Sequence, residues 1–461
     1  MTDPAGGAAA PRTGQPGLPA GLALGVVMLL IAATVALVVG RHDGPAAKDT
    51  ATVAGGGSQT VAVRLADMRI SPSVIKVPAG TRLVLEVTNT DTVRHDLHID
   101  GGPLTPPLAH GETARLDLGT VSRTVQGWCT VPGHKVAGMT MTIAVIGADR
   151  TPANHDMSTM PVTTTPTGAS PVIDFKAAPG PDWKPYDPSL KPASGATEHR
   201  LTLRIADTLV EVAPGVRQTM WTYNGTAPGP TLRGRVGDVF AVTLVNDADM
   251  GHGIDFHAGT LAPDKAMRTI EPGQSSTYQF TAKYSGAWLY HCSTMPMSLH
   301  IANGMFGAVI IDPPDLAEVD REFVLVQSEL YLGPQDGVAD EAKIAAEHPD
   351  AAVFNGYVKQ YDHAPIRVRA GERIRVWVID AGPQRSTSFH VVGAQFDTVF
   401  KEGAYLLRRG NAEHGAAQTL DLAPAQGGFV EFVLPEPGHY PLTDHAMVDG
   451  ERGAHGIFEA D

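Results

Sequence analysis

Apolar and polar residues alternate in three stretches of the chain, at positions 80–89, 237–246 and 371–380. Each stretch opens with a glycine and then places apolar side chains at every second position, as at Leu83, Leu85 and Ile374. A period of two is typical of a β-strand that buries one face. Because the pattern returns at long intervals, the chain is predicted to contain repeated domains. Short strands between turns rich in Pro and Gly favour Greek-key β-sandwiches and an all-β fold.

A segment at positions 21–39 breaks this alternation because it is almost continuously apolar. It is just long enough to span a bilayer as a helix. A cleaved signal peptide is the alternative, but the apolar run is long for one and no convincing cleavage site follows it. We therefore expect an uncleaved N-terminal transmembrane helix in the cell membrane, with the remaining chain on the extracytoplasmic side.

Changes in composition divide the chain into units. The short connection at 312–316 predicts that the last two sandwiches pack together as a rigid pair. The expected segments are a disordered tail (1–17), the anchor (18–40), a tether (41–59), a first sandwich (60–147), a Pro/Thr-rich linker (148–196), a second sandwich (197–314) and a third sandwich (320–461) with a helix-like insertion at 340–346.

Charge and cysteine content narrow the possible functions. The chain has 461 residues and a formal net charge of −14, which argues against nucleic-acid binding. It contains 2 cysteines, Cys129 and Cys292. A disulfide between them is the alternative to a metal role. We favour metal binding because each cysteine is followed by its own histidine and methionine.

The turn glycines of the repeat align the candidate ligands of the first two sandwiches. Counting the same distance from Gly80 and from Gly237 leads to His95 and His252. His98 is a rival to His95, but the alignment favours His95. One thiolate, two imidazoles and a thioether are the ligands of a blue-copper (type 1) electron-transfer site. The predicted sets are His95, Cys129, His134 and Met139 in the first sandwich, and His252, Cys292, His300 and Met305 in the second.

A second set of polar residues is expected on the opposite face of the second sandwich. Consecutive residues of a strand point to opposite faces, so His291 should point away from the side on which Cys292 binds copper. By the same parity, Asp255 and His257 share a face that is opposite to His252. The third sandwich lacks every inner ligand but retains His390 and His445. We therefore predict a second metal between the outer face of the second sandwich and the third sandwich, within one chain or between chains.

Several motifs together resemble those of the copper-containing nitrite reductases. They lie at positions 252–257, 290–292, 300–307, 388–393 and 443–445, and the resemblance covers about 195–461. The first sandwich resembles a cupredoxin, which is an electron carrier. The resemblance implies three tandem cupredoxin-like Greek-key sandwiches after the transmembrane helix. The loop between Cys292 and His300 is a residue shorter than in some members, which leaves the colour and potential of the site open.

The resemblance also implies roles for the site residues. It implies two type 1 coppers and one type 2 copper per chain, nitrite as substrate, a cytochrome or cupredoxin as electron donor, and a homotrimer with the type 2 site between subunits. His252, Cys292, His300 and Met305 would bind type 1 copper. His257, His291 and His445 would bind a catalytic type 2 copper, with Asp255 and His390 as the acid/base pair beside it.

Two other functions compete with nitrite reduction. A laccase-like multicopper oxidase needs about eight histidines, mostly in His-x-His pairs, to hold a trinuclear copper cluster. The chain contains no His-x-His, and Ser293 follows Cys292 where an oxidase would carry histidine. A non-enzymatic copper electron-transfer protein would account for both type 1 sets. It would leave the outer-face histidines and Asp255 without a function.

Overall fold

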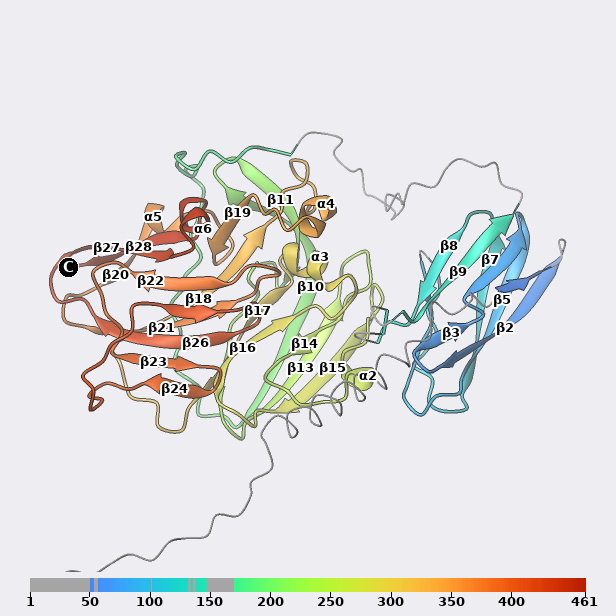
Figure 1. Cartoon of the computed structure of the whole chain (residues 1–461), viewed down its shortest axis with the longest axis horizontal. Helices are drawn as coiled ribbons and strands as arrows, with labels where there is room; N and C mark the ends of the chain where they lie inside the picture. Colours follow the sequence, from blue (N-terminus) through green and yellow to red (C-terminus); the bar gives the residue numbers. More distant parts are fainter. Residues whose placement is uncertain (1–49, 54–56, 101, 132–133, 136–137, 147–169) are drawn as a thin grey trace, which may run out of the picture. The chain divides into compact units, whose positions relative to one another are not determined.

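The computed structural model describes residues 50–53, 57–100, 102–131, 134–135, 138–146 and 170–461. Their regular secondary structure is almost entirely β-strand, in an all-β arrangement of cupredoxin-like sandwiches (Figure 1). Within the described ranges, no helix is both long and apolar enough to cross a membrane. The expected tail and anchor lie outside these ranges, so the anchor stays a prediction.

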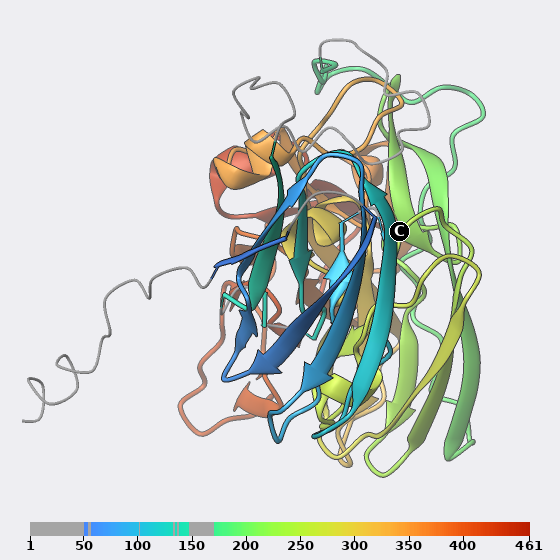
Figure 2. The ribbon, with the colours of Figure 1, turned by 90° about the vertical axis from the view of Figure 1, so that its right-hand side faces the viewer.

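Residues 50–146 form two sheets around one hydrophobic cluster that includes Ile75, Val87 and Met141 (blue and teal in Figure 2). The first strand lies within the segment that was expected to be a tether. It pairs in parallel with residues 74–76 through backbone hydrogen bonds. Because this pairing involves the backbone alone, the pattern of side chains does not reveal it. One sheet has the order β1 (Thr50–Thr52), β4 (Val74–Pro78), β9 (Thr140–Ile146), β8 (Val125–Trp128), β6 (His98–Ile99); the other has the order β3 (Arg69–Ser71), β2 (Ser58–Ala66), β5 (Thr81–Asn89), β7 (Thr113–Val121).

Residues 198–312 form a second pair of sheets, whose cluster contains Phe240, Phe256 and Tyr278. Two short helices interrupt the strands, α2 (Pro263–Ala266) and α3 (Met297–Ala302). One sheet has the order β11 (Val216–Tyr223), β10 (Glu198–Ala213), β13 (Val239–Asn246), β15 (Ser275–Thr281); the other has the order β12 (Leu232–Arg235), β17 (Phe306–Asp312), β16 (Gly286–His291), β14 (Asp255–Phe256).

Residues 321–460 form the third pair of sheets, around Phe389, Phe396 and Phe432. The predicted insertion is confirmed as helix α4 (Glu341–Ala345), and α5 (Gln360–His363) and α6 (Met447–Glu451) lie further along the chain. One sheet has the order β19 (Ala351–Phe354), β18 (Arg321–Leu330), β21 (Arg373–Asp380), β26 (Gly427–Val433), β23 (Thr398–Lys401), β24 (Ala404–Leu407); the other has the order β20 (Ala364–Val368), β28 (His455–Ala460), β27 (Gly438–Asp444), β22 (Thr387–Val391), β25 (Leu420–Leu422).

The three alternating stretches occupy the same place in three sheets. Strands β5, β13 and β21 each pair in parallel with the first long strand of their sheet and antiparallel with another. Gly80, Gly237 and Gly371 precede them with φ of +83°, +97° and +85°. This left-handed region suits glycine, because it has no Cβ to clash with the following carbonyl. The glycine count used to align the ligands therefore has a structural basis.

The second and third sandwiches are joined by a shared hydrophobic cluster. Leu289 and Phe306 of the second sandwich belong to the same cluster as Trp377 and Phe429 of the third. Ile344 of helix α4 belongs to the core cluster of the second sandwich. These contacts agree with the rigid pair expected from the short connection.

The described part of the linker, residues 170–196, runs along the surface of the third sandwich. The Trp183 ring lies 5.0 Å from the ring of Tyr357, and the backbone N–H of Tyr186 donates to the side chain of Gln360. Leu190 and Val324 add backbone hydrogen bonds between the linker and β18. Residues 147–169 lie outside the described ranges.

Candidate metal centres

His252, Cys292 and His300 converge in the interior of the second sandwich. The Nδ1 atoms of the two histidines lie 3.1 Å apart, and Sγ of Cys292 lies 3.9 Å from Nδ1 of His252. All three residues are buried. Cys292 follows the last residue of β16, and its backbone N–H donates to the carbonyl of Met305. Met305, the fourth predicted ligand, is fully buried in the same core cluster.

The segment between Cys292 and Met305 contains a helix, where the sequence suggested only a strand and a loop. Helix α3 carries His300 in its last turn. Asn303 ends it, with its side-chain amide donating to the carbonyl of Leu299. Gly304 then turns the chain back with φ of +97°, at a point where a Cβ would lie 2.7 Å from the Cβ of Ala227. The helix was missed because six residues are too few to show a helical period.

Burial favours the uncharged forms of the three side chains in this inner site. It lowers the pKa of His252 to about 3 and the pKa of His300 well below its ordinary value. Burial also raises the pKa of the Cys292 thiol. Two neutral imidazoles and a sulfur with converging lone pairs form a donor set that a soft, imidazole-binding metal can use. The donor set fits type 1 copper.

The ring of Trp221 covers the two histidines, a contact that the sequence analysis did not identify. Its centroid lies 4.8 Å from that of His300 and 5.6 Å from that of His252. Trp221 lies on β11, far from both histidines in sequence, so neither spacing nor parity could reveal it. The indole makes the surroundings of the site apolar, and such a shell affects redox potential.

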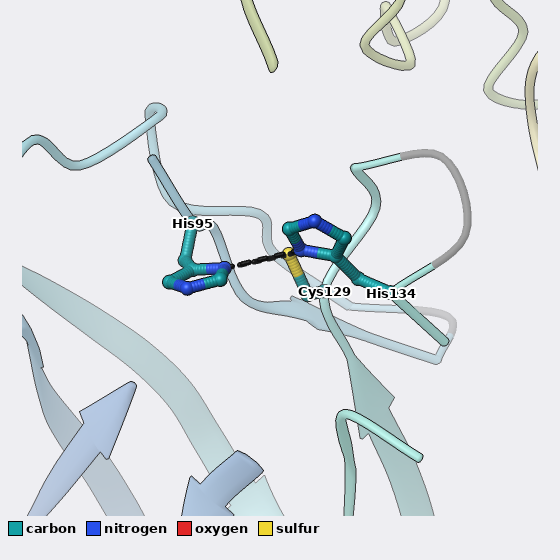
Figure 3. Close-up of side chains that lie close together, drawn as sticks. All are labelled: His95, Cys129 and His134. Carbon is teal, nitrogen blue, oxygen red and sulfur yellow. Dashed lines mark hydrogen bonds between the residues drawn. The ribbon is translucent and has the colours of Figure 1, made fainter. Parts of the chain in front are cut away.

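The first sandwich brings together a similar set, His95, Cys129 and His134 (Figure 3). Nδ1 of His134 lies 3.1 Å from Nδ1 of His95 and 3.4 Å from Sγ of Cys129. Burial raises the pKa of Cys129 and lowers the pKa of His134. Met139 is fully buried, and its carbonyl accepts the backbone N–H of Cys129. His98, the rival to His95, packs instead against the ring of Trp128 at 4.9 Å.

Asp255, His257 and His291 form a third group, on the other face of the second sandwich. Strand β14 pairs antiparallel with β16, which sets Asp255 directly opposite His291. The Nε2 atoms of His257 and His291 lie 3.1 Å apart, and Oδ2 of Asp255 lies 3.8 Å from Nε2 of His257. Burial and the neighbouring His291 lower the pKa of His257. Two imidazole nitrogens that face each other beside a carboxylate can hold a metal ion.

The grouping agrees with the parity argument, although the local structure differs from the expected one. Strand β14 covers only Asp255 and Phe256, so His252 lies outside it, in an isolated bridge with Ile270. His252 therefore reaches the inner site from a loop. Asp255 and His257 still share the outer face.

His390 and His445 lie close together on the third sandwich. Their ring centroids are 5.4 Å apart, on β22 and directly after β27. Nδ1–H of His390 donates to the carbonyl of Gln418 at 2.6 Å. His445 is exposed, with exposed Met447 and Val448 beside it. Within the described residues, neither histidine belongs to the group of Asp255, His257 and His291.

Both cysteines are free and buried, so the alternative of a disulfide between Cys129 and Cys292 is wrong. The third sandwich has a buried alanine, Ala454, where the second has Met305. Its core is packed without the inner ligands.

The chain is similar to two families of known proteins. Residues 204–316 match a family model described as multicopper oxidase, and residues 26–123 match one described as a cupredoxin-like domain. The copper-containing nitrite reductase of Neisseria meningitidis serogroup B is 35% identical over 294 residues, which cover 61% of this chain and 72% of that protein. The chain belongs to the copper-containing nitrite reductase family.

Solved structures extend this family assignment. A copper nitrite reductase from Nitrosomonas europaea matches with 32% identity and a TM-score of 0.53, covering 57% of this chain and 94% of that one. A multicopper oxidase structure matches with 29% identity and a TM-score of 0.50, covering 57% of this chain and 89% of that one. The copper-containing nitrite reductase family and this oxidase thus share the sandwich fold, and the metal-binding residues must separate their chemistries.

Proposed function

We propose that this chain reduces nitrite to nitric oxide, taking up one electron and two protons and releasing water. The observation that carries the proposal is the adjacency of two metal-binding groups. Cys292 belongs to the buried group with His252 and His300, and His291, the residue before it, belongs to the outer group with His257 and Asp255. One group suits electron relay and the other suits an anionic substrate.

The donor sets support copper in each place. His252, Cys292, His300 and Met305 would hold a type 1 copper, as would His95, Cys129, His134 and Met139 in the first sandwich. His257, His291 and His445 would hold a type 2 copper, giving two type 1 coppers and one type 2 copper per chain. Bound copper supplies the one-electron chemistry and a position for the nitrite anion.

The chain provides the electron path between the two groups of the second sandwich. Cys292 and His291 are joined by one peptide bond. The Nδ1–H of His291 also donates to the carbonyl of Cys292 at 2.8 Å, and this hydrogen bond provides a second connection between the two residues. This hydrogen bond fixes the imidazole tautomer and leaves Nε2 free to bind metal.

Asp255 and His390 are proposed to deliver the two protons. Asp255 lies beside His257, and its side chain is 26% exposed. Its carboxyl can therefore contact a nitrite bound near His257 and still exchange protons with water. The Nδ1–H of His390 is held by the Gln418 carbonyl, which leaves Nε2 as the nitrogen that can accept or give a proton.

A second copy of the chain is proposed to complete the type 2 site, in a homotrimer. His390 and His445 lie on the third sandwich and are separate from the Asp255 group within the described part of one chain. Met447 and Val448 beside His445 are 51% and 55% exposed, an apolar surface that suits a subunit interface. The export of the chain, its membrane anchor and a cytochrome or cupredoxin donor also remain proposals.

The decisive variant is His257→Ala, compared with His439→Ala. His439 lies on β27 and has a side chain that is 67% exposed, away from every candidate ligand. We expect His257→Ala to keep the blue absorption of type 1 copper and to lose nitric oxide formation, and His439→Ala to keep both. Unchanged nitric oxide formation in His257→Ala would refute the site assignment. Oxygen consumption with a phenol, if found instead, would support a multicopper oxidase.

A further inference from the structure

The two candidate type 1 sites have the same backbone framework. Asn89 and Asn246 each donate through Nδ2 to two loop carbonyls, and each accepts through Oδ1 the backbone N–H of the second residue after it. That second residue is Asp91 in the first sandwich and Ala248 in the second. The ligand histidines His95 and His252 also pair with equivalent backbone carbonyls. The side chains around the two sites can therefore be compared position by position.

The first difference lies behind the histidine ligand. The Nε2–H of His95 donates to Oδ2 of Asp91 at 3.2 Å. Ala248 stands in the equivalent place in the second sandwich, and the buried Nε2 of His252 has no protein hydrogen-bond partner among the described residues. A carboxylate that accepts the N–H of a ligand imidazole makes that imidazole a stronger donor to its metal.

The second difference lies beside the cysteine ligand. Asp96 is buried, and its two carboxyl oxygens accept the backbone N–H and the hydroxyl of Thr130, both at 2.6 Å. Gly253 takes this place in the second sandwich, where its backbone N–H donates to Sγ of Cys292 at 3.4 Å. A Cβ on Gly253 would lie 2.3 Å from Oγ of Ser293, so this site excludes any side chain there.

Both differences act on copper in the same direction. A carboxylate near the metal favours the more positive Cu(II) over Cu(I). The second site instead has the ring of Trp221 over its histidines, and this apolar cover favours the less charged Cu(I) site.

We propose that Asp91 and Asp96 are positioning residues that keep the N-terminal copper at a lower reduction potential than the copper at Cys292. Electrons then pass from the first sandwich to the second, and the first sandwich serves as the built-in electron donor of the proposed nitrite reductase. Each transfer would oxidise the copper held by His95, Cys129 and His134 from Cu(I) to Cu(II) and reduce the copper held by His252, Cys292 and His300 from Cu(II) to Cu(I), with no proton moved. The inference rests on copper binding as set out under the proposed function.

The test is a spectroelectrochemical titration of the copper-loaded full chain without nitrite. Cys129→Ser and Cys292→Ser, each lacking one blue site, assign the two midpoint potentials. We expect the lower midpoint at the Cys129 site. In Asp91→Asn that midpoint should rise so that the equilibrium constant for transfer to the Cys292 site falls about tenfold, or about 59 mV for a one-electron couple. The midpoint of the Cys292 site should not change.

Asp117→Asn is the matched control, because Asp117 is an exposed carboxylate of the same sandwich that pairs with Arg82. It should leave both midpoints unchanged. If Asp91→Asn binds no copper, Asp96→Asn and the converse Ala248→Asp replace it, with an expected rise at Cys129 and an expected fall at Cys292. An N-terminal midpoint at or above the other, or Asp variants that shift neither midpoint, would overturn the proposal. Because no nitrite is present, this result is independent of whether the chain makes nitric oxide.

Discussion

The Nδ1–H of His291 donates to the backbone carbonyl of Cys292 at 2.8 Å, so the two neighbouring residues are joined by a hydrogen bond as well as by the peptide. The imidazole is thereby fixed with Nε2 directed at Nε2 of His257. The hydrogen bond that fixes the ring needs no side chain from elsewhere in the chain. The link between the proposed electron-relay site and the proposed substrate site thus consists of two consecutive residues at one strand end.

Replacing Asp255 by Asn should separate proton delivery from metal binding. Asn keeps the size of the side chain and removes the carboxyl that lies 3.8 Å from Nε2 of His257. We expect nitric oxide formation to fall by about 100- to 10,000-fold, the usual worth of a general acid, with the blue absorption intact. The measurement is nitric oxide release under an artificial reductant. Asp249→Asn, at an exposed carboxylate of the same sandwich, is the control and should retain full activity.

Adding one methyl group at Gly253 should disturb the inner site of the second sandwich. The new Cβ would lie 2.3 Å from Oγ of Ser293, which donates to the carbonyl of Met267. We expect Gly253→Ala to lower copper affinity by about 10- to 100-fold, in the range of losses caused by changes around metal ligands. Competition with a chelator measures it. Adding Ser293→Ala should restore part of the affinity, and a failure of this rescue would contradict the steric explanation.

The raised pKa of Asp380 predicts that the stability of the third sandwich depends on pH. Burial and the carboxylates of Glu329 and Asp444 raise the pKa of Asp380 to about 8 from an ordinary 3.8. The folded chain therefore keeps a proton that the unfolded chain loses, and stability falls as pH rises between these values, by up to about 1.4 kcal/mol per pH unit. Below pH 3.8 both states are protonated and the loss disappears.

Asp380→Asn should remove this loss of stability at higher pH. Asn89 and Asn246 occupy the equivalent positions in the other sandwiches, and each donates through Nδ2, whereas Oδ2 of Asp380 is buried without a partner among the described residues. We expect the variant to gain on the order of 2 kcal/mol in unfolding free energy at pH 7, and less at pH 5. Urea denaturation of the metal-free protein at both pH values measures the gain. Asp421→Asn, on the surface, should show no such dependence.

The side chain of Asp340 caps helix α4. It accepts the backbone N–H groups of Ala342 and Lys343, at the start of the helix that brings Ile344 into the core of the second sandwich. Asp340→Ala should lower the free energy of unfolding by about 0.5–2 kcal/mol. Thermal unfolding of this variant beside Glu341→Ala, which lacks a capping bond, isolates the contribution of the cap.

The sequence was sufficient where geometry follows from strand spacing. The turn glycines recur at equivalent places, so counting from Gly80 and Gly237 led to His95 and His252. Alternation along the strand ends separated His291 from Cys292. These predictions depend only on the period of a β-strand, which is the same in every sheet.

Other features depend on contacts between distant segments or between chains. Trp221 reaches His300 across the sandwich, and Asp96 meets Thr130 after 34 residues, so no local pattern marks either contact. Helix α3 was missed because its six residues are too few to show a helical period. Whether His445 meets His257 depends on how copies assemble, and one sequence contains no periodicity that reports on assembly.

The two candidate copper-binding loops close in the same way, although they differ in length. In each, the backbone N–H of the cysteine donates to the methionine carbonyl, and the N–H of the methionine donates to the histidine carbonyl. Four residues separate His134 from Met139 and four separate His300 from Met305, whereas the cysteine-to-histidine spans differ. For protein engineering, the segment from histidine to methionine thus has a constant length, and the segment from cysteine to histidine is the one whose length can vary. Loop exchange between the two sandwiches should respect that division.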